Sequence, residues 1–385
     1  MRGFMKQFKL FYFILYFTWS TVYTLVTLYM NEVVGLSLAQ IGLMMSVLPL
    51  ISLVFQPVWG GVADFSGRRK NVLQTLILMN AALAGIITFF TNSFAVILLY
   101  FLYQLFLCGQ GPLTDSMSIQ LVNQTPNSSF GFIRVWGSVG YAIGAFAVAA
   151  VANQLGLKWM FYIASIGYFV SWMLTFNFKA VQIPIKKSHF KSDLKTLLKQ
   201  KEYLFVLIYS FFLVGSFFGA DQYLGLFIRS NNIEVSMLGV LTFISVCVEV
   251  PIIFHSKRLI NKYGAVKLLI IMNIIAVVRM VILSFSSTLL MFAIAGLLRG
   301  MIVGIFVPIF IEIICDITPK AVVTSAVAIY SAVSSGIANF VFTLAGGLIA
   351  DRFGYEALFL GYGVIMLLPL VLAIKINKAK GLTSD

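Results

Sequence analysis

The sequence predicts an all-α membrane protein with twelve transmembrane helices in two pseudo-symmetric six-helix bundles. Three observations lead there: an apolar composition, uninterrupted apolar stretches of helical length, and a loop pattern that recurs four times. Of the 385 residues, 60% are hydrophobic and only 10% are charged, whereas about a quarter are charged in soluble domains. Because no soluble fold could hide that much apolar surface, the water-soluble globular classes are excluded.

The apolar stretches have the length of membrane-spanning helices, since about 20 residues cross a hydrocarbon core of about 30 Å. Barrel strands are excluded because they are about ten residues long and alternate in polarity. The first stretch has no small-residue cleavage site after a short core, so we expect a retained anchor rather than a signal peptide. The predicted spans are residues 8–30, 38–62, 72–90, 95–121, 132–154, 158–178, 203–229, 235–256, 265–285, 289–315, 321–349 and 354–376.

The placement of the net charge of +14 predicts the topology. With the N-terminus inside, the cytoplasmic segments hold 21 Lys and Arg residues, whereas the outside loops hold only Lys158, Arg229 and Arg352. This positive-inside bias predicts a multi-pass protein of the cell (inner) membrane with both termini in the cytoplasm. The basic excess therefore indicates contact with the anionic lipid bilayer, and we expect no nucleic-acid partner.

The loop pattern consists of an Asp or Asn followed three residues later by Gly. The four copies begin at Asp64, Asn153, Asn261 and Asp351, separated by 89, 108 and 90 residues. The chain is thus predicted to contain four three-helix repeats, nested in two halves as in secondary transporters. The predicted domains are an N-terminal half 1–178, a basic cytoplasmic linker 179–202 and a C-terminal half 203–385.

One charged turn between the second and third spans is a candidate conformational gate. Its glycines allow close helix approach, and its aspartate can cap a helix or pair with arginines at the cytoplasmic face and so latch one state. The alternative is a charged turn that only fixes the topology. The candidate residues are Gly60, Asp64, Gly67, Arg68 and Arg69.

Six ionisable residues lie within the predicted spans: the acids Asp115, Asp221 and Glu249, and the bases Arg134, Arg279 and Arg299. Such groups cost several kcal/mol at membrane depth unless they are paired or face water, so we expect them to line a shared cavity. Spans four and five form a hairpin near Pro126, with Asp115 11 residues before it and Arg134 eight after it. At 1.5 Å per residue their depths differ by about 4–5 Å, which an arginine side chain can bridge.

Several of these stretches resemble a known family. Gly60–Arg69 resembles the loop motif of the major facilitator superfamily, although Phe65 replaces the usual arginine. Pro112–Asp115 together with Gly131–Tyr141 resembles the branch of lactose permease-like oligosaccharide–proton symporters, phenylpropionate permeases and nucleoside–proton symporters. The resemblance covers essentially the whole chain, and the phenylpropionate-type group is the most similar.

The resemblance implies a secondary active transporter that takes up a small polar organic solute with protons by alternating access. In the lactose permease type, the acid and arginine at the positions of Asp115 and Arg134 grip sugar hydroxyls, and an aromatic residue stacks on the sugar ring. Tyr141 lies seven residues after Arg134 on the same helix face, with Ser138 between them. A sugar or oligosaccharide is therefore favoured, although this pair equally suits a substrate carboxylate, and a structural ion pair is the alternative.

Glu249 is the candidate proton carrier because the residues around it in span eight are apolar, which favours the neutral form of a carboxyl group. A structural hydrogen bond to another helix is the alternative. The lactose permease type has a histidine in span ten and a glutamate three residues later, but here these positions hold Arg299 and Ile302. Any proton pathway is therefore expected to involve Glu249, Asp221, Arg279 and Arg299.

Other functions are weighed against symport. Substrates other than sugars stay open, namely an aromatic carboxylate or a nucleoside. A proton-driven exporter is disfavoured because Gly137 to Gly156 contains no proline, whereas such exporters carry a Gly-Pro-x-x-Gly-Gly stretch in span five. No catalytic motif such as His-Glu-x-x-His is visible, so we expect no enzyme, and a transporter-like receptor without flux is a further alternative.

The remaining cysteines and histidines predict no further site. Cys108, Cys247 and Cys315 are isolated, and neither His189 nor His255 has an acidic or cysteine partner at ligand spacing. We therefore expect no metal, no cofactor and a functional monomer whose partners are a small-molecule substrate, protons and lipid.

Overall fold

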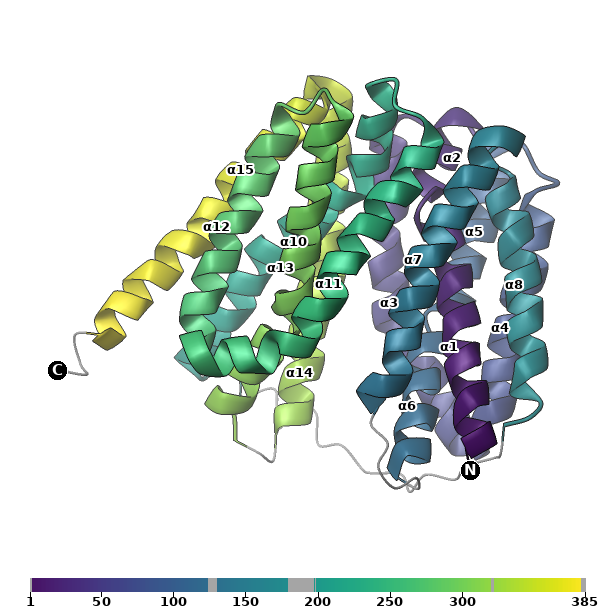
Figure 1. Cartoon of the computed structure of the whole chain (residues 1–385), viewed down its shortest axis with the longest axis horizontal. Coiled ribbons are helices and arrows are strands. Elements are labelled where there is room, and N and C mark those ends of the chain that lie inside the picture. Colours follow the sequence, from purple (N-terminus) through teal and green to yellow (C-terminus); the bar gives the residue numbers. More distant parts are fainter. Residues whose placement is uncertain (1, 124–129, 179–196, 198, 320–321, 382–385) are drawn as a thin grey trace. The chain divides into compact units, whose positions relative to one another are not determined.

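The computed structural model describes residues 2–123, 130–178, 197, 199–319 and 322–381, and these form helices with no strand (Figure 1). The predicted linker 179–202 lies largely outside these residues, as does the turn at Pro126. The helices are α1 (Arg2–Tyr23), α2 (Val26–Glu32), α3 (Leu38–Ser66), α4 (Arg69–Ile87), α5 (Ser93–Leu107), α6 (Gln110–Asn123), α7 (Phe130–Leu155), α8 (Trp159–Thr175), α10 (Lys201–Ser230), α11 (Val235–Tyr263), α12 (Ala265–Ser284), α13 (Leu289–Ile317), α14 (Val323–Ser331), the π-helix η1 (Ala332–Ala338) and α15 (Asn339–Gly381).

The described helices supply the twelve segments that the sequence predicts. Ten helical stretches are long and apolar enough to cross a membrane, and Trp159–Thr175 is a shorter apolar helix. The longest stretch, Ser325–Val371, has 47 residues, and Gly354 interrupts it with φ 84° and ψ 172°. This break separates two arms of crossing length, which correspond to predicted spans eleven and twelve.

The four glycines of the recurring loop pattern all adopt positive φ. The angles are 62° at Gly67, 97° at Gly156, 79° at Gly264 and 84° at Gly354. This region of backbone conformation is open to glycine because it has no Cβ. The recurring glycine therefore allows the chain to reverse sharply between neighbouring helices, which explains its place in each repeat.

Two predicted spans are broken in the structure. Span one divides into α1 and α2 at a turn around Thr24, and span four divides into α5 and α6 at Cys108 and Gly109. A side chain at Gly109 would contact Trp59 and Leu76 at 2.9 Å or less, so glycine permits the close approach there. Hydropathy predicts apolar length but not such breaks, because the residues on both sides stay apolar.

The described helices group into two compact units. Unit 1 comprises Met1–Ser37, Leu50–Lys186 and Asn232–Phe243, and unit 2 comprises Leu38–Pro49, Lys187–Asn231 and Ile244–Asp385. Within unit 1, α1 packs mainly against α7 and α8; within unit 2, α15 packs against α10 and α12, and α13 against α12. The candidate site residues lie on helices of these two units, except Gly67 and Arg68, which lie between α3 and α4.

Candidate functional site

An aromatic face of α1 forms the base of the polar site in unit 1. Tyr12, Tyr16 and Trp19 follow one another at intervals of four and three residues, so they lie on one face of the helix. The Tyr12 and Tyr16 rings stack with centroids 5.7 Å apart, and the Tyr16 and Trp19 ring centroids lie 4.4 Å apart. Tyr12 is completely buried, whereas Trp19 is partly exposed.

Asp115 on α6 is held by α1 through a hydrogen bond. The Tyr12 hydroxyl donates to Asp115 Oδ1 at 2.7 Å, and the Ser118 hydroxyl donates to the Tyr12 hydroxyl oxygen at 2.9 Å. Asp115 is half-buried, and its hydrogen-bonding partner is a neutral phenol in place of the cation that a buried carboxylate usually requires.

Arg134 on α7 is held by the next tyrosine along α1. Its guanidinium carbon lies 4.3 Å from the centre of the Tyr16 ring, which is a cation–π contact. Asp115 and Arg134 interact electrostatically, yet among the described residues they form no ion pair with each other. The two charges predicted to lie at similar depth therefore share the α1 face as neighbours without bonding directly.

Glycines on α7 allow this close approach to α1. Any Cβ at Gly140 would overlap the Phe13 carbonyl, and any Cβ at Gly144 would overlap the Phe17 carbonyl. The two backbones therefore touch, which brings a charge on α7 within reach of rings on α1.

The other two predicted substrate residues lie further along α7. Ser138 and Tyr141 are both half-buried, and the Tyr141 ring centroid is 6.4 Å from that of Tyr23, the next aromatic on the same face of α1. Trp19 Nε1 donates to Gln110 Oε1 at 3.2 Å. The aromatic rings of Tyr23 and Tyr141 and the Gln110 amide thus lie further along the same helices than the charged pair.

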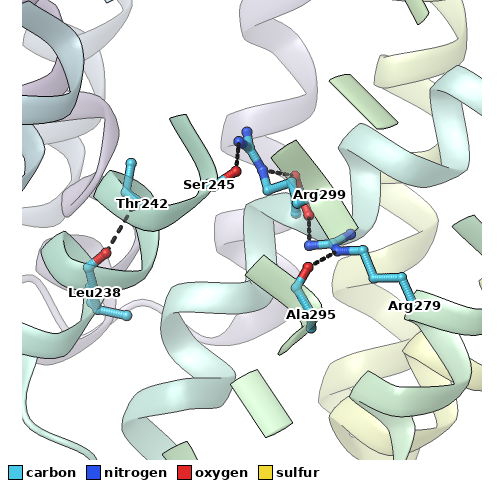
Figure 2. A network of polar contacts seen from close by, with 7 residues as sticks. Leu238, Thr242, Ser245, Arg279, Ala295 and Arg299 are labelled. Atoms are coloured by element: carbon cyan, nitrogen blue, oxygen red, sulfur yellow. Dashed lines mark hydrogen bonds and ion pairs between the residues drawn. The ribbon is translucent and has the colours of Figure 1, made fainter. Parts of the chain in front are cut away.

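Unit 2 contains a cluster of one carboxylate and two guanidiniums, drawn in Figure 2. Asp221 on α10 accepts from Arg279 on α12 at 2.6 Å and from Arg299 on α13 at 2.7 Å. Arg279 Nε also donates to the Ala295 carbonyl at 3.1 Å, and Arg299 Nη1 donates to the Ser245 hydroxyl on α11 at 3.2 Å. The cluster therefore joins four helices and carries one formal positive charge in excess.

Burial differs within this cluster. The Arg279 side chain is 0% exposed, Asp221 9% and Arg299 22%. Arg279 also lies 4.9 Å from the centre of the Phe217 ring. Arg279 is therefore the fully buried cation of the cluster, and Arg299 is its most exposed member.

Glu249 lies on α11 four residues after Ser245, on the same helix face, and is half-buried. The backbones of α11 and α13 touch there, since any Cβ at Gly300 would overlap the Ser245 carbonyl and one at Gly304 would lie 2.9 Å from the Glu249 carbonyl. The four residues predicted for proton coupling thus all belong to the same region of unit 2.

The predicted gate turn forms an ion pair within its own motif. Arg69 Nε donates to Asp64 Oδ1 at 2.9 Å and Arg69 Nη2 at 2.5 Å, whereas Arg68 is exposed. Gly67 adopts positive φ between them. A Cβ at Gly60 or at Gly67 would meet nothing within 4 Å, so the predicted close helix approach at these glycines is wrong, and Gly67 instead permits the turn. The turn is therefore fixed by Asp64 and Arg69, at the start of α4.

Sequence reasoning missed the residues that hold the two charges in unit 1. Their signal was present in the sequence, because aromatic residues recur at intervals of four and three along the first span. The polar partners on α6 lie on a face of that helix toward α1 and have no such pattern. The missed residues are Tyr12, Tyr16 and Ser118 around the charges, together with Trp19 and Gln110, which bond to each other.

No group of three or more His, Cys, Asp or Glu residues that could hold a metal ion occurs in the described ranges of the chain. The described part of the chain consists of apolar helices of membrane-crossing length with charged residues among them, which is the architecture of a polytopic membrane protein. Comparisons with known proteins define the class further.

Residues 5–361 match the model of the "MFS_1 like family". The chain therefore belongs to this family of the major facilitator superfamily, as its motifs predicted. It is 26% identical over 372 residues to the maltose permease of Geobacillus stearothermophilus, covering 96% of this chain and 94% of the permease. It is 21% identical over 391 residues to the raffinose permease of Escherichia coli, covering 95% and 91%.

Among solved structures, the nucleoside transporter NupG matches with a TM-score of 0.83 at 16% identity, covering 97% of this chain and 99% of that one. At this identity the likeness concerns the fold, and it confirms the major facilitator architecture. These three relatives are permeases and transporters, in agreement with the prediction that the chain is not an enzyme.

Proposed function

We propose that the protein takes up a sugar or short oligosaccharide together with protons, by alternating access. The observation that carries this proposal is the pair Asp115 and Arg134, two opposite charges on adjoining helices that do not pair with each other. A sugar hydroxyl can donate to the carboxylate while its neighbour accepts from the guanidinium, and aromatic rings beside them suit the apolar face of a sugar.

The likeness to a maltose permease and a raffinose permease over nearly the whole chain supports a sugar as the solute. Ser138 and Tyr141 extend the proposed site along α7. The two halves, 1–178 and 203–385, are proposed to rock about it, with the Asp64–Arg69 turn regulating the change of state.

Proton coupling is proposed to use the charged cluster of unit 2. Glu249 lies next to Ser245, which receives a hydrogen bond from Arg299, and Arg299 pairs with Asp221. Loading a proton on Glu249 would remove one negative charge from this region of unit 2 and so bias the helices that meet there. The lysine and arginine distribution supports a multi-pass protein of the cell (inner) membrane with both termini in the cytoplasm, and we propose that it functions as a monomer.

A nucleoside is the second candidate solute, because the Tyr16 and Trp19 rings also suit a stacked base. An aromatic carboxylate is the third, because a guanidinium fork binds a carboxylate. Counterflow in proteoliposomes separates the three classes, with maltose, raffinose, uridine and phenylpropionate tested side by side.

We expect exchange of maltose or raffinose to exceed that of the other two solutes. Preferential exchange of uridine or phenylpropionate would overturn the sugar assignment. If labelled sugar left the vesicles only in exchange for protons moving in the opposite direction, the protein would be an exporter, and the uptake assignment would be overturned.

A further inference from the structure

We infer that two tyrosines of α1 are positioning residues that keep the substrate-binding charges apart. Tyr12 uses its hydroxyl to hold the Asp115 carboxylate, and Tyr16 uses its ring to hold the Arg134 guanidinium. This inference rests on the proposed function, in which both charges contact the sugar. The inference explains why the Asp115 carboxylate and the Arg134 guanidinium stay available to bind the sugar.

Tyr12 hydrogen-bonds to only one of the two carboxylate oxygens of Asp115. Its hydroxyl donates to Asp115 Oδ1 at 2.7 Å, whereas Oδ2 has no hydrogen-bond partner within the described part of the chain. The hydroxyl is itself oriented by Ser118 at 2.9 Å, and the Tyr12 ring is completely buried. The carboxylate is therefore fixed in place by a neutral group, with an acceptor oxygen still open.

The Tyr16 ring holds Arg134 through a cation–π contact, which uses none of the N–H groups of the guanidinium as hydrogen-bond donors. The ring of Tyr16 is stacked on that of Tyr12 with an interplanar angle of 7°, so one rigid pair of rings carries both contacts. Gly137 provides the space, because a Cβ there would lie 3.0 Å from Tyr16 Cδ2 and 3.1 Å from Arg134 Nη1. The N–H groups of the guanidinium stay available to oxygen acceptors.

Without these two tyrosines, a carboxylate and a guanidinium on touching helices would form an ion pair. A sugar would then have to break that pair before it could bind, which lowers its affinity. With the charges held apart, neighbouring hydroxyls can donate to Asp115 and accept from Arg134 at the same time. The arrangement favours a neutral polyol over an anion, since the open Asp115 oxygen repels a substrate carboxylate.

The test compares Tyr12→Phe, Tyr16→Phe and Tyr16→Leu in maltose counterflow. Tyr12→Phe removes the hydroxyl and is expected to raise the half-saturating maltose concentration about tenfold or more. Tyr16→Leu removes the ring and is expected to do the same. Tyr16→Phe keeps the ring and is expected to stay within about twofold of the wild type.

Tyr103→Phe is the matched control, because Tyr103 is an equally buried tyrosine of unit 1 whose hydroxyl bonds to Tyr168 at 2.7 Å. It is expected to leave the half-saturating concentration unchanged. Equal effects of Tyr12→Phe and Tyr103→Phe, or equal effects of Tyr16→Phe and Tyr16→Leu, would overturn the inference.

A second measurement needs no substrate. The thermal unfolding temperature is recorded for Asp115→Asn, Arg134→Gln and the double variant, in the wild-type and in the Tyr12→Phe background. We expect only a small coupling between the two changes in the wild type, where the charges interact without an ion pair, and a clearly larger coupling in Tyr12→Phe, where they pair. Equal coupling in both backgrounds would overturn the inference. A wild type that does not exchange maltose would count against the proposed function instead, and this cycle would still decide the role of Tyr12.

Discussion

Arg279 and Asp221 form an ion pair of 2.6 Å in which the arginine side chain is entirely buried. Arg299 donates to the other carboxylate oxygen of Asp221 at 2.7 Å. The Asp221 carboxylate thus holds two guanidiniums near each other within unit 2. We therefore expect the stability of unit 2 to depend on the Asp221 carboxylate more than on either arginine alone.

Asp221→Asn is expected to destabilise the protein by about 3–5 kcal/mol, because it leaves a buried guanidinium without its counter-charge. Thermal unfolding of the purified protein in detergent measures this. Adding Arg279→Met to Asp221→Asn is expected to restore much of the loss, since the buried cation is removed as well. Glu202→Gln, at the exposed start of α10, is the control. Unfolding of Asp221→Asn at the wild-type temperature would contradict the structural role of the pair.

Gly300→Ala is expected to move α13 away from α11, because its Cβ would overlap the Ser245 carbonyl and lie 2.9 Å from Val248 Cβ. Arg299 is the preceding residue, so its contacts with Asp221 and Ser245 would weaken. We expect a loss of about 1–3 kcal/mol in the free energy of unfolding and slower counterflow. Gly361→Ala is the matched control, since a Cβ there meets nothing within 4 Å. If Gly300→Ala and Gly361→Ala had the same stability and the same counterflow rate, the close packing of α13 on α11 would be contradicted.

Asp64→Asn is expected to slow transport about tenfold, equivalent to about 1.4 kcal/mol on the barrier, with little change in substrate binding. The reason is that Asp64 bonds to Arg69 within the turn before α4 and to no residue of the proposed substrate site. Rates of counterflow and equilibrium binding of the same sugar are compared, with Asp351→Asn, three residues before the break at Gly354 in α15, as control. A tenfold loss of affinity at an unchanged rate would place Asp64 in binding instead of switching.

Glu249→Gln is expected to abolish uphill accumulation of sugar while exchange across the membrane continues, because glutamine resembles the protonated carboxyl. Accumulation under an imposed pH gradient and counterflow without one are measured on the same proteoliposomes. Glu202→Gln serves again as the control. Normal accumulation by Glu249→Gln would move the proton role to Asp221 or remove it.

The helices and their turns could be predicted from the sequence because apolar length and the recurring glycine report directly on membrane crossing and chain reversal. All four predicted glycines have the positive φ that the turns require. The cluster of Asp221, Arg279 and Arg299 was predictable as a set, since buried charges must find partners.

The partners of Asp115 and Arg134 were not predictable in the same way. Charge and depth alone favour a direct pair, but the structure places Tyr12 and Tyr16 beside these charges instead. Contacts of this kind depend on the rotation of α1 against α6 and α7, which follows from the close packing of Gly140 and Gly144. Hydropathy and helical spacing within one span carry no information about that rotation.

The most direct measurement is substrate binding by the double neutral variant Asp115→Asn with Arg134→Gln. If both charges contact the sugar, each single change and Arg134→Lys abolish binding, since lysine keeps the charge but loses the planar fork. The double variant then also fails to bind, although it still inserts and folds. Binding restored in the double variant would show that the two charges only neutralise each other between helices, and would contradict a sugar site at Asp115 and Arg134.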